Sequence, residues 1–183
     1  MDIHICQLEI GHSFGVIGQL FELAMVISSL YPFHIGIINQ GIYLFTYLLR
    51  SDENALTPQS VRRLLTGPAR RCTINVQDSV TSTNTVLKAI AEQGGAEGMT
   101  LIAQQQTQGK GRLGRTFLSP KGTGLYISVL LRPKFSAEES LCVTTAAAVA
   151  VAEAIDCVTG QYAQIKWVND VYVKGRKVGG ILT

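Results

Sequence analysis

Alternation of hydrophobic and polar residues predicts short strands after residue 70. Residues 72–77 alternate, and residues 99–103 and 125–131 are apolar runs of strand length between turn-forming residues. Such runs are typical of strands that are half-buried or buried in a sheet. The same signals predict further strands at residues 165–167, 171–173 and 177–182. The turn residues between the last two strands predict a hairpin.

Helical spacing of apolar residues predicts two longer helices. Residues 84–93 carry one apolar face, with hydroxyl residues suited to capping before them and two glycines after them. An alanine-rich helix is predicted over residues 136–157, opened by a capping box. Strands and helices are mixed without regular βαβ alternation. The pattern therefore predicts an α+β fold with a mixed, mainly antiparallel sheet and flanking helices.

The N-terminal part of the chain has a different character. Residues 14–38 form an apolar stretch long enough to cross a bilayer, but a glutamine, a glutamate, a proline and a histidine interrupt it. We therefore expect a short, apolar, buried helical segment rather than a membrane span. A short linker helix is predicted over residues 57–66. This gives an N-terminal segment with its linker helix over residues 1–68, and one folded domain over residues 69–183.

Charge divides the chain in a similar way. Residues 1–49 hold three of the 13 acidic residues and no Lys or Arg, so all 16 basic residues follow them. Binding to DNA phosphates needs Lys or Arg, which argues against an N-terminal DNA-binding domain. All three histidines precede residue 35, which excludes Ser-His-Asp and Cys-His catalysis from the basic part. The four cysteines lack CxxC spacing, and we expect reduced thiols in a cytoplasmic protein.

A glycine- and arginine-rich loop at residues 106–115 is the strongest local signal. Its sequence, QTQGKGRLGR, has three glycines that free the backbone and three cations within six residues. Such a loop is suited to bind a phosphate or a carboxylate. It has neither Walker A spacing nor the helix that follows a dinucleotide-binding GxGxxG. Taken alone, it fits an anion site for a nucleotide, a loop that contacts nucleic acid, or a solvated turn.

Three further motifs are ambiguous when each is taken alone. Residues 166–170 (KWVND) bring a lysine, an amide and a carboxylate to the junction of two strands, which suits a nucleotide or Mg²⁺ but also an ordinary turn. Two adjacent glycines in residues 177–182 indicate close approach to the backbone, although Lys177 also fits a solvated hairpin. Residues 82–84 (STN) start a helix and can serve as caps alone.

Together and in this order, the four motifs resemble those of bacterial-type biotin–protein ligases over about residues 70–183. The loop and the hairpin are highly specific in combination, and each is much less so alone. The chain departs from the family pattern at three positions. Lys110 stands where arginine is commoner, Phe117 replaces a usual tryptophan, and Val168 stands where proline is common.

The resemblance implies an ATP-dependent biotin–[acetyl-CoA-carboxylase] ligase. Members of the family join the carboxylate of biotin to ATP, release pyrophosphate and hold biotinyl-5′-AMP. A lysine of a biotin carboxyl carrier protein then takes the biotin, and Mg²⁺ is expected to accompany ATP. Because two anions meet in the first step, the site needs fixed cations rather than a base. The absence of histidine from this region agrees with that requirement.

The resemblance also assigns roles to individual residues. Lys177 and Arg112 are expected to be catalytic, and Asp170 is expected to hold Mg²⁺. The residues expected to bind biotin are Ser82, Thr83, Asn84, Gln106, Lys110, Gly111, Arg112 and Lys177. The residues expected to bind ATP and the adenylate are Arg112, Arg115, Phe117, Lys166, Asn169 and Asp170.

Two other functions stay open at this point. One is a lipoate–protein ligase or octanoyl transferase of the same fold, which the glycine- and arginine-rich loop disfavours. The other is a nucleic-acid-binding, biotin-responsive repressor, which the uncharged N-terminal part disfavours. We expect binding to neither DNA nor membrane, and the sequence leaves a homodimer open. The family continues past the final residues with more sheet and a small C-terminal domain, so we expect the last strand to lack a neighbour.

Overall fold

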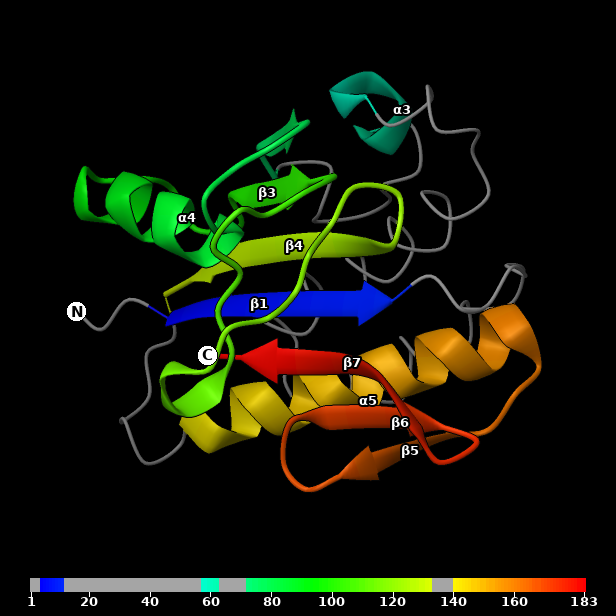
Figure 1. The fold of residues 1–183 in the computed structure, drawn as a ribbon. Coiled ribbons are helices and arrows are strands. Elements are labelled where there is room, and N and C mark those ends of the chain that lie inside the picture. Colours follow the sequence, from blue (N-terminus) through cyan, green and yellow to red (C-terminus); the bar gives the residue numbers. More distant parts are fainter. Residues whose placement is uncertain (1–3, 12–56, 63–71, 133–139) are drawn as a thin grey trace.

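The computed structural model describes residues 4–11, 57–62, 72–132 and 140–183. These residues form a seven-stranded sheet in the order β2-β3-β4-β1-β7-β6-β5, with two longer helices packed on it (Figure 1). The strands are β1 (His4–Gly11), β2 (Ile74–Gln77), β3 (Thr100–Ala103), β4 (Gly124–Leu131), β5 (Ala163–Lys166), β6 (Asp170–Val173) and β7 (Arg176–Leu182). The helices are α3 (Pro58–Arg62), α4 (Thr83–Glu92), α5 (Ser140–Thr159) and the 3₁₀ turn η2 (Arg112–Gly114).

The two longer helices cover opposite faces of the sheet. On β4, Leu125, Ile127 and Leu131 belong to the same core cluster as the alanines of α5, whereas Leu130 packs with Leu87 of α4. Successive residues of a strand point to opposite faces, so α5 and α4 lie on different sides of β4. Burial on both faces explains why the sequence of β4 is a nearly continuous apolar run.

The α+β class and the mixed, mainly antiparallel sheet are confirmed. β2 and β3 pair in parallel, and the other described strand pairs are antiparallel. The predicted helix at residues 84–93 is α4, and that at 136–157 is α5, whose proposed capping box lies outside the described residues. Among the described helices, none has the length and apolarity to span a membrane. The apolar stretch at residues 14–38 lies outside them.

The strand β1 lies inside the sheet, where it pairs antiparallel with β4 over residues 4–11 and with β7 over residues 7–10. Residues 4–11 are thus a strand and not helical, in keeping with the alternation of Cys6, Leu8 and Ile10 with polar residues. The expectation that the last strand lacks a neighbour is also wrong, because β7 pairs with both β6 and β1. The domain boundary between residues 68 and 69 stays a prediction. The strand β1, which lies on the N-terminal side of this boundary in the sequence, is part of the sheet.

Helix α5 carries a carboxyl group in an environment that favours its protonated form. Glu153 is half-buried, and its Oε2 has no hydrogen-bond partner among the described residues. Burial raises the pKa of the Glu153 carboxyl to about 7, and the negative charge of Asp156 also raises it. The folded chain therefore holds a proton at Glu153 under conditions where an exposed glutamate is ionised.

Candidate functional site

A buried polar network lies at the start of α4. Gln106 is 4% exposed, and its Oε1 accepts hydrogen bonds from the Thr83 backbone N–H at 2.8 Å and from Thr83 Oγ1 at 3.0 Å. Its Nε2 donates to Ser119 Oγ at 3.0 Å, and Ser128 Oγ donates to Thr83 Oγ1 at 2.8 Å. The network ties the start of α4 to β4 and to the loop that follows β3.

Ser82 precedes α4 and is fully buried, yet its Oγ has no hydrogen-bond partner in the described part of the chain. Ser82 occupies the N-cap position, but its side chain makes no capping bond, so the hydroxyl does not act as a cap. A buried polar atom without a partner is costly and is uncommon in proteins. Its position beside a polar network makes it a suitable contact for a polar group of a ligand. Asn84, which is half-buried, lies in the first turn of the same helix.

The glycine- and arginine-rich loop folds back on itself. Bridges join Gln106 to Ser119 and Lys110 to Thr116, and η2 forms the tip. A Cβ atom at Gly109 would lie 2.4 Å from the Phe117 carbonyl oxygen and 2.5 Å from Ser119 Oγ. Glycine is therefore required at this position by close contact, which agrees with the interpretation of the loop as one that needs its glycines.

An open pocket of about 570 Å³ lies beside this loop. Lys110, Gly111 and Arg115 line it from the loop, and Leu182 lines it from the end of β7. Two cations and free loop backbone at one pocket suit an anionic ligand.

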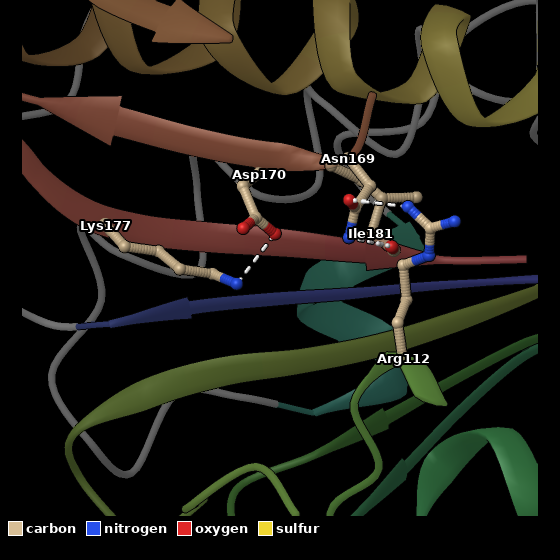
Figure 2. Close-up of polar contacts among 5 residues, drawn as sticks. All are labelled: Arg112, Asn169, Asp170, Lys177 and Ile181. Atoms are coloured by element: carbon tan, nitrogen blue, oxygen red, sulfur yellow. Dashed lines mark hydrogen bonds and ion pairs between the residues drawn. The ribbon is translucent and has the colours of Figure 1, made fainter. Parts of the chain in front are cut away.

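Three polar contacts lie along β6 and β7, and one of them reaches the loop (Figure 2). Arg112 Nη1 donates to Asn169 Oδ1 at 3.1 Å, and Asn169 Nδ2 donates to the Ile181 carbonyl oxygen at 3.1 Å. Lys177 Nζ donates to Asp170 Oδ1 at 2.7 Å, and both side chains remain partly exposed. The tip of the loop is thereby connected to the strands that carry the KWVND and glycine-pair motifs.

The strand β7 passes close beneath this ion pair. A Cβ atom at Gly180 would lie 3.5 Å from Lys177 Nζ and 3.7 Å from Asp170 Oδ1. The lysine and the aspartate therefore lie over the backbone of the glycine pair, as the sequence interpretation of a closely approached backbone requires.

Not every predicted site residue lies among these contacts. Lys166 is exposed and has its Nζ 6.0 Å from the centre of the Tyr172 ring. Phe117 packs against the core cluster of Val80, Ala103 and Tyr126. Neither residue lines the pocket.

Two members of the polar network were missed by the sequence interpretation. Ser119 lies four residues after the glycine- and arginine-rich loop and was given no role, and Ser128 was interpreted only as part of an apolar strand. A lone serine in the run LYISVLL was the available signal, because a buried polar side chain requires a partner.

Comparison with known proteins shows the family of the chain. Residues 76–183 match the Biotin/lipoate A/B protein ligase family. The chain belongs to this family, and the resemblance to biotin–protein ligases is confirmed.

Relatives of known name are similar to part of the chain. The bifunctional ligase/repressor BirA of Bacillus spizizenii is 37% identical over 107 residues, which are 58% of this chain and 33% of that protein. The human biotin–protein ligase is 39% identical over 93 residues, which are 46% of this chain and 12% of that protein. The chain thus spans about a third of BirA, the first of these curated relatives.

A solved structure supports the fold. The biotin protein ligase from Aquifex aeolicus in complex with biotin and ATP is 38% identical, with a TM-score of 0.51. The match covers 60% of this chain and 45% of that chain.

Proposed function

We propose that this chain carries catalytic-domain residues of a biotin–protein ligase, which forms biotinyl-5′-AMP from biotin and ATP and passes biotin to a lysine of a biotin carboxyl carrier protein. The observation that carries the proposal is that the glycine- and arginine-rich loop connects three sites. Its base belongs to the buried network around Gln106, its middle lines a cationic pocket, and its tip contacts Asn169. A neutral ring system and an anionic tail can therefore be bound along one path.

The buried end of this path suits the ring system of biotin. The side chains of Thr83 and Gln106 are fixed, because the hydrogen bonds between them lie within the buried interior. Ser82 Oγ offers an unused hydroxyl there. A fixed polar site with one open hydrogen-bonding atom discriminates well against ligands that lack the matching group.

The cationic part suits the reaction between two anions. A carboxylate oxygen of biotin attacks the α-phosphorus of ATP, the bond from that phosphorus to the bridging oxygen breaks, and pyrophosphate leaves. Lys110, Arg112, Arg115 and Lys177 would stabilise the charge that grows on these oxygens. The acceptor amine then attacks the carbonyl carbon, loses a proton and displaces AMP to form an amide.

Asp170 is the residue proposed to hold Mg²⁺ with the nucleotide. Mg²⁺ neutralises phosphate charge and commonly takes one or two protein carboxylates, with phosphate oxygens and water completing its shell. Across the described ranges, no three His, Cys, Asp or Glu side chains come together as a metal site. A single carboxylate at Asp170 fits this mode of binding. Since Lys177 is paired with Asp170, the lysine would leave the aspartate when it turns to the reacting anion.

Cytoplasmic location and the carrier-protein partner form part of the same proposal. Repression, which the name of the Bacillus relative includes, is not proposed here, since the first 49 residues contain no Lys or Arg for phosphate contacts. A homodimer stays open. A lipoate ligase is disfavoured, because the named relatives above are biotin ligases.

The test is to incubate the chain with biotin and α-labelled ATP, with and without a biotin carboxyl carrier domain. Labelled biotinyl-AMP should form, and adding the carrier should convert it to labelled AMP and biotinylated carrier. Parallel reactions with lipoate and octanoate should give less adenylate. Lys177→Ala should abolish most of the product, while Lys174→Ala, which removes an exposed lysine of the same hairpin, should not. Adenylate formed from lipoate but not biotin would refute the proposal.

A further inference from the structure

We infer that Asn169 is a positioning residue, which holds the tip of the glycine- and arginine-rich loop over β7 and so fixes Arg112 beside the pocket. Its importance for the reaction rests on the proposed function, whereas its effect on the loop does not. The inference goes beyond a nucleotide-binding role, because Asn169 acts here through another side chain of the protein.

The orientation of the Asn169 amide is set by its partners. The backbone oxygen of Asn169 accepts a hydrogen bond from the Ile181 N–H at 2.8 Å, and Nδ2 donates to the Ile181 carbonyl oxygen at 3.1 Å. Only the amide nitrogen can donate to that carbonyl, and only the amide oxygen can accept from Arg112. The two contacts therefore agree on one orientation, with Oδ1 directed at Arg112 (Figure 2).

The tip of the loop has little else to hold it. Leu113 is 91% exposed, and the hydrogen bonds from Gly111 N–H to the Arg115 carbonyl and from Arg115 N–H to the Arg112 carbonyl stay within the loop. Among the described residues, the bond from Arg112 to Asn169 is the hydrogen bond that joins residues 112–114 to another element. Since the far end of this bond is anchored on β7, it limits the movement of the tip across the pocket.

This tether also leaves Arg112 able to bind an anion. A guanidinium has five N–H donors, and Asn169 is bonded to one of its nitrogens, Nη1. The Arg112 side chain is exposed, so its remaining donors are available to a carboxylate or phosphate bound at the tip of the loop. A cation that is already oriented stabilises a developing charge without first having to be ordered.

The experiment measures hydrogen–deuterium exchange of the backbone amides at residues 109–117 in the whole chain without ligand. Asn169→Ala and Arg112→Gln should each speed exchange by about three- to tenfold, the loss expected for one partly exposed hydrogen bond. The double variant should exchange no faster than either single one, since both remove the same contact. Gln164→Ala, an exposed residue of the neighbouring strand β5, is the matched control and should leave exchange unchanged.

Asn169→Asp separates this role from a general structural one. The carboxylate keeps an acceptor for the guanidinium but loses the donor to Ile181, so exchange of the loop should stay within about twofold of wild type. Exchange as fast as in Asn169→Ala would show that an acceptor facing Arg112 does not hold the tip, which would overturn the inference. Unchanged exchange in Asn169→Ala, or effects that multiply in the double variant, would overturn it as well.

Adenylation separates the inference from the proposed function. Asn169→Ala should slow biotinyl-AMP formation less than Arg112→Gln does, because the guanidinium itself remains, and the double variant should be no slower than Arg112→Gln. If Asn169→Ala weakens ATP binding further in the Arg112→Gln background, Asn169 contacts the nucleotide itself and the inference fails. If wild type forms no biotinyl-AMP, the proposed function fails, while the exchange measurements still decide the role of Asn169.

Discussion

The unpaired hydroxyl of Ser82 allows a prediction in which stability and binding change in opposite directions. Ser82→Ala removes a fully buried oxygen that has no partner among the described residues. Burial of an unsatisfied hydroxyl costs about 1–3 kcal/mol. Without ligand, the free energy of unfolding should therefore rise, by about 1 kcal/mol after allowing for the small void that remains. If Ser82 were an N-cap instead, its removal would lower that free energy by about 1 kcal/mol.

The same substitution should weaken biotin binding. Loss of one neutral hydrogen bond in a buried site lowers affinity by about three- to tenfold. Urea unfolding followed by circular dichroism measures stability, and titration calorimetry measures biotin affinity. Ser79→Ala, at an exposed serine just before the network, is the control for both measurements. A less stable Ser82→Ala protein with unchanged biotin affinity would mean that the hydroxyl serves the fold and that the ring site lies elsewhere.

Four further changes test other parts of the structure. Gln106→Leu removes three buried hydrogen bonds and should lower the free energy of unfolding, measured by urea unfolding, by about 3 kcal/mol. A loss below about 0.5 kcal/mol would mean that these hydrogen bonds do not stabilise the fold. Gly109→Ala should lower the melting temperature far more than Gly111→Ala, whose Cβ would have its nearest neighbour at 3.4 Å; equal shifts would argue against the required glycine. Lys177→Ala should slow single-turnover adenylation by on the order of 10²-fold with little change in biotin affinity, whereas a surface lysine would leave the rate unchanged. The pKa of Glu153 is raised from the unfolded value of 4.5 to about 7, so its protonated carboxyl contributes stability that is complete below about pH 4.5 and is lost as pH rises through 7. This loss in the free energy of unfolding should be about 1 kcal/mol between pH 5 and 8, and Glu153→Gln should remove it. A pH profile of stability that is the same in Glu153→Gln and wild type would refute this reasoning.

The sequence was informative wherever a local rule determined the structure. Helical spacing and capping residues predicted α4, and the turn between residues 173 and 176 predicted the β6–β7 hairpin. The four motifs contained nearly all residues that meet around the loop. Such signals work because each depends on neighbours within a few residues.

Long-range pairing was the part that local patterns could not supply. The place of β1 between β4 and β7 depends on which distant strand edges are free, and its eight residues alone carry no such information. Likewise, the bond between Arg112 and Asn169 joins residues 57 positions apart, and nothing in the local sequence around either residue predicts the other as its partner.

The central position of β1 has a consequence for how the chain folds. The sheet section β2-β3-β4 lies within residues 74–131 and can pair early, while β5, β6 and β7 are neighbours along the chain. Within the described sheet, the two halves are joined by β1, which pairs residues 7–10 with residues 179–182. Contacts between such distant residues close very large loops and slow folding. During synthesis, β1 can pair with β4 before β7 has emerged from the ribosome, and its other edge then stays exposed to mispairing until β7 arrives.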